Sequence, residues 1–172
     1  MSTLLLVPLE DLVVFPNMTV TLTVDVVGEE RVLLVPRHEN EYATVGTVVN
    51  VLDSVRLPGG ARAVSLEGLH RAVAGAASTD SAGRLRVEID ERPDEDPPRA
   101  QTQALETEYR AIVEEILELR DADERISAFL RSITEPGALA DTAGYSPDLS
   151  FEQKVELLET LDVVERLPPP PP

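Results

Sequence analysis

The spacing of apolar residues changes near residue 92, and this change limits the folds open to the chain. Between Thr19 and Val24, apolar residues alternate with threonines, and a similar alternation returns in "RLRVEIDE", residues 84–91. A period of two is typical of a β-strand with one buried face. Beyond residue 99 the apolar residues recur every three or four positions, which indicates amphipathic helices. The sequence therefore predicts an α+β chain, with strands first and helices second.

The first part contains several short segments that we expect to form antiparallel strands. Besides the two alternating stretches, these are "RVLLVP", "VGTVVNVLDSVRL" and "RAVSLEGLHRAVAGA", which begin at residues 31, 45 and 62. The second segment runs into Leu57-Pro58-Gly59-Gly60, whose proline and glycines suit a hairpin turn. Many short strands separated by turns favour a small barrel or sandwich for residues 1–92.

A proline-rich acidic stretch separates the two parts. "RPDEDPPR", residues 92–99, holds three prolines and three acidic residues, a composition that suits neither a strand nor a helix interior. We therefore assign residues 93–98 to a connection and residues 99–167 to a helical lobe. Residues 168–172 are all proline, and we expect them to end the last helix and to form a polyproline tail.

Three helices are predicted in the second part. The first has an apolar stripe of Leu105, Tyr109, Ile112, Ile116 and Leu119. The second covers residues 121–133, is ended by Pro136 and Gly137, and has an inner face of Ile126, Phe129, Leu130 and Ile133. The third covers residues 150–167, with Ser150 and Gln153 at capping-box spacing and an inner face of Phe151, Val155, Leu158 and Leu161.

Composition narrows the function classes. The chain has 32 acidic and 15 basic residues, a formal net charge of −17, which argues against a nucleic-acid partner. Residues 93–172 carry 19 of the acidic and 7 of the basic side chains, which we interpret first as a solvated surface. The sequence has no cysteine, no signal-peptide pattern and no apolar stretch long enough to span a membrane. We expect a cytoplasmic protein.

A search for reactive groups finds none in a recognisable motif. The single lysine, Lys154, follows no P-loop, and the two histidines, His38 and His70, are not arranged as H-E-x-x-H. No G-x-S-x-G elbow supports a serine nucleophile, and His70 is better explained as a surface or structural residue. The sequence therefore predicts no catalytic, cofactor-binding or metal-binding residue, and a binding or assembly module rather than an enzyme.

Four stretches resemble one protein family in the same order. "VPLEDLVVFPNM", residues 7–18, is similar to the start of the N-terminal domain of the ATP-dependent protease Lon, which typically reads P-L-x-D-x-V-V-F-P-x-M. "LLVPRHENEYATVGTVVNV", "LEGLHRAV" and "LADTAGYSPDLSFEQKVELLETLDVVERL" resemble later segments of that domain. The resemblance covers residues 4–167. The segments V-G-T and "ADTAGYSP" look most like those of actinobacterial members of the family.

This resemblance implies a fold and a function. The fold is a PUA-like antiparallel β-barrel lobe followed by an α-helical bundle lobe. The function is recognition of unfolded, damaged or degron-bearing proteins for ATP-dependent proteolysis, together with support of oligomer assembly. Expected partners are such substrates, further copies of the chain or a Lon ATPase-protease module, without nucleic acid or membrane. Candidate contact residues are Phe15, Pro16, Met18 and Leu57, although Phe15 and Met18 are better explained as core anchors.

Two other hypotheses stay open at this point. The chain is alternatively a stand-alone adaptor or assembly protein that uses its acidic helical lobe to bind a basic partner, and its binding would then weaken steeply with salt. A third hypothesis, an unrecognised hydrolase, would require His70 or a pair of carboxylates in a cleft.

The sequence departs from the Lon family at three places. Glu10 stands where the family usually has arginine, so that a salt bridge there would change sign. Only three residues separate Val27 from Arg31, where the family usually inserts a helix. The terminal prolines replace the family's long helix into the ATPase, and no ATPase or Ser-Lys protease module is present in these 172 residues. We also interpret Pro8 and Pro16 as punctuation between the first two strands.

Overall fold

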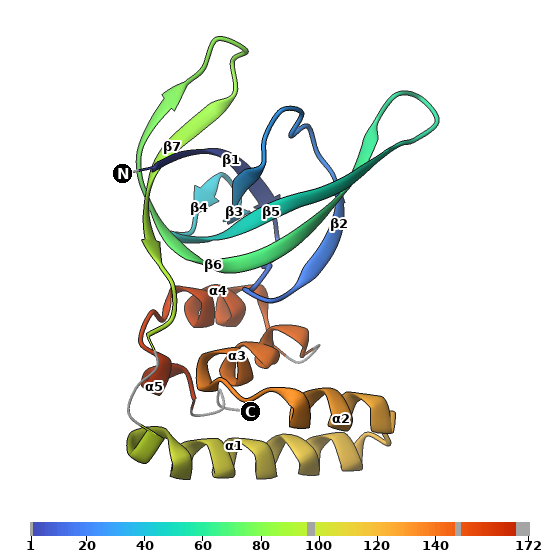
Figure 1. The fold of residues 1–172 in the computed structure, drawn as a ribbon, viewed down its shortest axis with the longest axis vertical. Helices are drawn as coiled ribbons and strands as arrows, with labels where there is room; N and C mark the ends of the chain where they lie inside the picture. Colours follow the sequence, from blue (N-terminus) through green and yellow to red (C-terminus); the bar gives the residue numbers. More distant parts are fainter. Residues whose placement is uncertain (1, 96–98, 147–148, 168–172) are drawn as a thin grey trace. The chain divides into compact units, whose positions relative to one another are not determined.

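Strands form the first part of the chain and helices the second, as the apolar spacing predicts (Figure 1). The computed structural model describes residues 2–95, 99–146 and 149–167. The chain divides into two compact units, residues 1–93 and residues 94–172. Part of the predicted connection, residues 96–98, and the whole polyproline tail lie outside the described residues.

Seven strands form one sheet in the first unit. They are β1 (Ser2–Glu10), β2 (Thr19–Thr23), β3 (Arg31–His38), β4 (Glu41–Tyr42), β5 (Val45–Arg56), β6 (Arg62–Thr79) and β7 (Leu85–Arg92). The neighbours follow the order β1-β7-β6-β5-β3-β4, and β1 also pairs with β3. The pairings β1-β7-β6-β5-β3 therefore return to the strand from which they start. Within the described residues, β2 pairs with β6 alone and β4 with β3 alone.

One strand pairing differs from the expectation of purely antiparallel strands. β1 and β3 run parallel, with Leu6 opposite Leu33, whereas the other pairings are antiparallel. The interpretation of Pro8 as punctuation is wrong, because Pro8 lies inside β1 opposite Val35. Its position is still explained by hydrogen bonding. The antiparallel register of β1 with β7 ends at Leu5, so Pro8 needs no N–H on that side.

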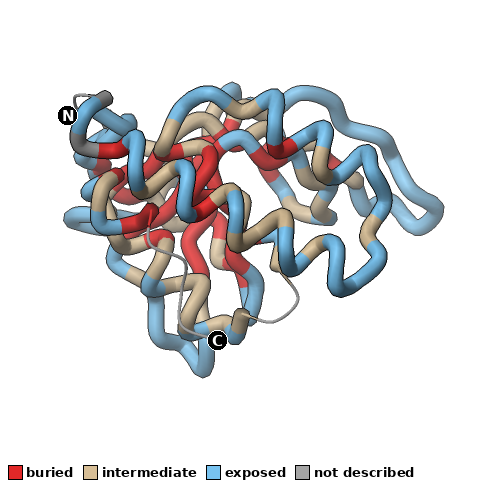
Figure 2. The backbone as a smooth tube through the Cα atoms, turned by 90° about the horizontal axis from the view of Figure 1, so that it is seen from below, coloured by how far each residue is buried: buried red, intermediate tan, exposed pale blue. Residues whose placement is uncertain are grey.

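Aliphatic side chains form the core of the sheet. One buried cluster contains Leu6, Leu33, Val35, Val48, Ala72, Val87 and Ile89. These residues come from β1, β3, β5, β6 and β7, the five strands whose pairings close on themselves. The first five residues of β5 are buried and its last five are exposed, and the last five residues of β6 are exposed as well. Figure 2 shows the buried backbone inside the molecule and exposed backbone around it.

Ion pairs form at Glu10 and in the loop after β2, two places that the sequence analysis singled out. Glu10 pairs with Arg37 of β3, so an acidic residue does form a salt bridge there. The short loop after β2 is held against the β6–β7 hairpin, since Glu29 pairs with Arg86. Arg86 also donates to Asp80 over 3.1 Å. The ion pair of Glu29 thus holds one end of this loop, and the burial of Val26 holds the other.

The second unit consists of short helices around one longer helix. These are α1 (Arg99–Leu119), α2 (Glu124–Ser132), α3 (Pro136–Asp141), the 3-10 helix η1 (Thr142–Tyr145), α4 (Phe151–Glu159) and α5 (Val163–Arg166). Tyr109, Leu139, Ala140 and Leu167 form the buried cluster of this unit. The expected first helix is confirmed as α1, although Ile116 and Leu119 at the end of its apolar stripe are 42% and 81% exposed. The capping box of α4 is also confirmed, because the Ser150 hydroxyl accepts from the Gln153 N–H.

Two predictions for α2 are wrong. Pro136 begins α3 instead of ending α2, because proline fits the first turn of a helix, where its missing N–H costs nothing. Of the expected inner face of α2, Ile126 and Phe129 are 45% and 50% exposed, and Leu130 is the buried residue of this helix.

The predicted last helix is divided in two. α4 ends at Glu159, and Asp162 caps α5 by accepting from the N–H groups of Val164 and Glu165. An aspartate at this position offers the backbone a new helix start, which competes with continuation of the first helix.

A buried arginine connects three segments of the helical unit. The side chain of Arg166 is fully buried and donates to Asp141 over 2.9 Å and to Asp94. Asp141 is itself buried at the end of α3, and Asp94 lies near the start of the unit. Two carboxylates thus balance one guanidinium in a low-dielectric setting, where loss of the cation would leave buried negative charge.

We expect Arg166→Leu to destabilise the helical unit by about 3–5 kcal/mol, because it leaves Asp141 buried without this partner. The measurement is urea unfolding followed by far-UV circular dichroism. Arg131→Leu is the matched control, since it breaks an exposed pair with Glu114 and should change little. Equal effects of the two substitutions would contradict this account of Arg166.

The stability contribution of Asp80 should depend on pH. The pKa of Asp80 lies below its usual value, mainly because its carboxylate accepts a hydrogen bond from the Arg84 backbone N–H. Hydrogen bonds from Ala82 and Arg86 lower the pKa further, whereas desolvation acts in the opposite direction. A carboxyl with a lowered native pKa stabilises the fold at pH values above its unfolded pKa, and this contribution is lost as the pH falls through the native pKa. The stability difference between wild type and Asp80→Asn should therefore be largest near pH 7 and shrink below pH ~4. A difference that stays constant from pH 7 to 3 in thermal unfolding would contradict this.

Candidate functional site

Three of the four candidate contact residues lie in a buried turn. Phe15 is 0% exposed, and Pro16 and Met18 are buried with it. The Met18 N–H donates to the Phe15 carbonyl over 3.2 Å, and Asn17 adopts a positive φ of 72° between them. This burial agrees with the interpretation of Phe15 and Met18 as core anchors. Their role as contact residues stays a prediction.

The turn is fastened to two strands of the sheet. The Thr47 hydroxyl of β5 donates to the Val14 carbonyl over 2.7 Å. The Gly68 N–H of β6 donates to the Met18 carbonyl over 2.7 Å, and the Gly68 carbonyl accepts from the Asn17 N–H over 3.0 Å. A β-carbon at Gly68 would lie 2.6 Å from the Phe15 carbonyl oxygen. Only glycine allows this approach of the two backbones.

The buried side chain of Arg71 packs against the same turn. Its guanidinium carbon lies 5.9 Å from the centre of the Phe15 ring. An arginine over an aromatic face is attracted by the ring quadrupole, and burial strengthens that attraction. The turn at residues 15–18 therefore contributes buried packing to the sheet through the ring of Phe15.

The fourth candidate residue lies at an exposed hairpin tip. The Leu57 N–H donates to the Ala61 carbonyl over 2.7 Å, and Gly59 and Gly60 both have positive φ values, of 94° and 93°. This confirms the predicted turn at residues 57–60. Leu57 is 37% exposed at the tip of the β5–β6 hairpin, which projects from the rest of the sheet (Figure 1).

Two further apolar residues of this hairpin were missed by the sequence analysis. Leu52 is 48% and Val55 is 63% exposed. We name Leu52, Val55 and Leu57 the hairpin apolar cluster. The sequence did carry a signal, because the adjacent apolar residues Val51 and Leu52 break the period of two. In the structure, the register of β5 with β6 shifts between Val51 and Asp53. Beyond that shift the strand leaves the core, while its apolar residues continue.

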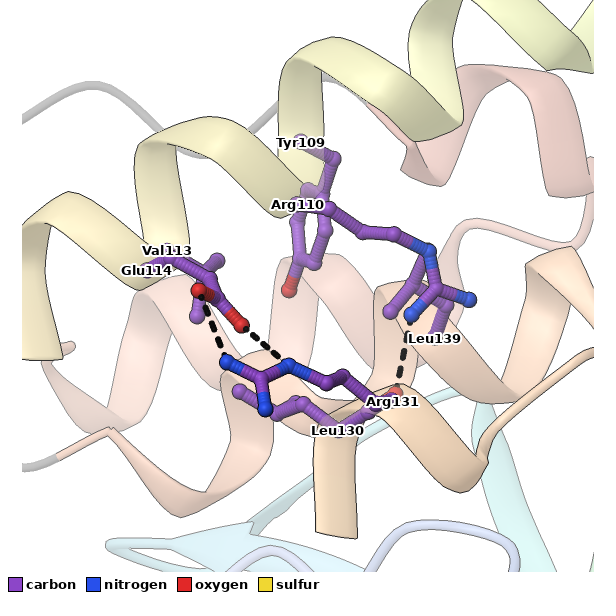
Figure 3. A pocket seen from close by; sticks show the side chains of 7 residues that line it. All are labelled: Tyr109, Arg110, Val113, Glu114, Leu130, Arg131 and Leu139. Carbon is purple, nitrogen blue, oxygen red and sulfur yellow. Dashed lines mark hydrogen bonds and ion pairs between the residues drawn. The ribbon is translucent and has the colours of Figure 1, made fainter. Parts of the chain in front are cut away.

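A hollow in the helical unit is too small for a ligand. It has a volume of about 30 Å³, room for a water molecule, and is lined by Tyr109, Arg110, Val113, Glu114, Leu130, Arg131 and Leu139 (Figure 3). Arg110 donates to the Leu130 carbonyl over 2.9 Å and so provides a partner for a backbone carbonyl in the last turn of α2. Burial raises the pKa of the Tyr109 hydroxyl, which lies 3.2 Å from the Thr142 hydroxyl.

The histidine considered for hydrolysis has a carboxylate as its partner. His70 Nε2 lies 2.9 Å from Glu91 Oε1, and the same oxygen accepts from Arg31 over 3.0 Å. The hydrogen bond with His70 is the main cause of a lowered pKa of Glu91, and the hydrogen bond from Arg31 is the second. This arrangement is a surface ion-pair network. Among the described residues, no group of three or more histidine, aspartate or glutamate side chains is placed to hold a metal ion, and no helix is long and apolar enough to cross a membrane.

Gly68→Ala should destabilise the sheet unit by about 1–3 kcal/mol, because the new methyl group must displace the Phe15 carbonyl. Gly75→Ala is the matched control in the same strand, where the nearest atom to the new carbon lies 3.3 Å away. Urea unfolding of both variants checks the prediction. A smaller loss for Gly68→Ala than for Gly75→Ala would show that the turn is not packed as described.

Comparison with known proteins identifies a single family. Residues 3–168 match the family model described as the ATP-dependent protease La (LON) substrate-binding domain. The chain is 39% identical to Lon protease of Chloroflexus aurantiacus and 38% identical to Lon protease of Salinispora arenicola, over 96% and 97% of its own length. It spans only 22% and 23% of the length of those relatives.

A solved structure agrees with the sequence matches. The N-terminal domain of Mycobacterium avium complex Lon protease superimposes with a TM-score of 0.82 at 32% identity, over 96% of this chain and 94% of that one.

Proposed function

The chain belongs to the family of the Lon protease substrate-binding domain, and from this premise we propose that it captures unfolded or damaged polypeptides for ATP-dependent proteolysis. The observation that carries the proposal is the hairpin apolar cluster, three aliphatic side chains exposed on one projecting hairpin. Exposed apolar side chains on one projecting element are a feature of interaction sites, and unfolded chains expose apolar segments that can bind there.

The architecture proposed for this function is the one that the family implies. We propose that the closed set of strand pairings corresponds to a PUA-like barrel and that the helices act as a bundle. No catalytic step is assigned to this chain. ATP hydrolysis and peptide hydrolysis would depend on a Lon ATPase-protease module, of which these residues would be the recognition part, and we propose that they also support oligomer assembly.

Leu57→Asp should weaken the binding of a permanently unfolded polypeptide by about tenfold, because burial of one leucine contributes about 1.5–3 kcal/mol. Reduced, carboxymethylated α-lactalbumin labelled with a fluorophore is a suitable probe, with anisotropy as the readout. Leu119→Asp, at an 81% exposed leucine of α1, is the matched control and should leave the affinity unchanged. Unchanged affinity for Leu57→Asp in a folded protein would refute a role for the cluster.

The same titration separates the adaptor hypothesis from client capture. Apolar binding should change little between low and high salt, whereas an acidic surface that binds a basic partner should lose affinity steeply. Steep salt dependence, together with insensitivity to Leu57→Asp, would favour the stand-alone adaptor.

A further inference from the structure

β2 exposes a strand edge that no other part of the described sheet covers. Five strands take part in the closed set of pairings and have neighbours on both sides. Among the described strands, β2 and β4 have one partner each, and β4 is only two residues long. β2 is five residues long and reads Thr-Val-Thr-Leu-Thr, without a charge or a proline. Protein sheets commonly protect open edges with such residues, and β2 has none of them.

The backbone groups on this edge can be assigned from the register. Gly68 donates to the Met18 carbonyl at the start of the β2–β6 pairing. Hydrogen-bonded pairs alternate along antiparallel strands, so Val20 and Leu22 exchange bonds with β6. The N–H and C=O groups of Thr21 and Thr23 therefore point away from β6, toward the uncovered side. They form a row of donors and acceptors with strand spacing.

The exposed side chains of β2 lie on the same face of the sheet as Val55 of the hairpin apolar cluster. Val55 lies opposite Ala63 across β5 and β6, and Ala63 lies opposite Thr23 across β6 and β2. Residues directly opposite each other project from the same face of a sheet. The exposed side chains of β2 thus share a face with Val55, and a strand added beside β2 would place every second side chain on that face.

We propose that β2 binds an extended segment of an unfolded polypeptide as an added β-strand, with the backbone of Thr21 and Thr23 making the main-chain hydrogen bonds. This inference rests on the proposed function and specifies how the client is held. Strand addition takes its affinity from main-chain bonds and its specificity from alternate side chains. The client chemistry that fits is an extended segment of alternating β-branched or aromatic residues, without proline at the bonding positions.

Amide hydrogen exchange by NMR tests the proposal directly. In the free protein the amides of Val20 and Leu22 should exchange slowly and those of Thr21 and Thr23 quickly. Saturation with reduced, carboxymethylated α-lactalbumin should slow the two threonine amides at least tenfold. If the probe binds by anisotropy and these rates do not change, strand addition at β2 is refuted while client capture stands. If the probe does not bind, the proposed function fails as well.

Thr21→Pro provides a second test. It removes an N–H that faces the open edge and leaves the β6 ladder intact, which edge strands tolerate. Affinity for the probe should fall at least tenfold, with Leu22 still protected. Tyr42→Pro is the matched control on β4: the Ala43 N–H bonds to the Pro36 carbonyl, so by the same alternation the Tyr42 N–H faces away from β3. Equal losses in the two variants would refute the assignment to β2, and if Thr21→Pro does not fold, the exchange rates of the wild-type protein decide.

Discussion

The parallel pairing of β1 with β3 is the constraint on which the first unit depends. It joins the two ends of the strand path, so that the edges of β1 and β3 find partners instead of solvent. β2 lies between these strands in the sequence but is not part of the closed path, and it pairs only with β6 among the described strands. The pairing that gives five strands two neighbours each thus leaves β2, and the two-residue β4, with one open edge, and the candidate binding surface follows from how the sheet closes.

The buried turn explains how this arrangement is held in place. Phe15 and Met18 fill the space beside β5 and β6, and Gly68 brings the two backbones into direct contact. The turn immediately precedes β2, so its position sets where β2 begins along β6. Residues that the family resemblance suggested as contacts therefore position the strand that we propose makes the contacts.

Local pattern predicted the parts of the structure that local interactions determine. The alternation in residues 84–91, the hairpin at Leu57 and the capping box at Ser150 all depend on near neighbours in the sequence, and the structure confirms each. The parallel pairing of β1 with β3 and the burial of Arg71 depend on contacts between distant segments, for which a single sequence carries no local signal. Phe129 was expected on a buried face but is 50% exposed. An amphipathic stripe identifies the apolar face of a helix, but it does not show whether another element covers that face.

The repetition of threonine along β2 has a consequence for how a bound chain would behave. Thr19, Thr21 and Thr23 present the same side chain at each outward position, so a bound strand that slips by two residues meets the same chemical surroundings. Such an edge does not define one register, and a client would have several alignments of nearly equal free energy. A chain pulled from one end could then move along the edge in short steps, each replacing bonds with equivalent ones, without complete dissociation.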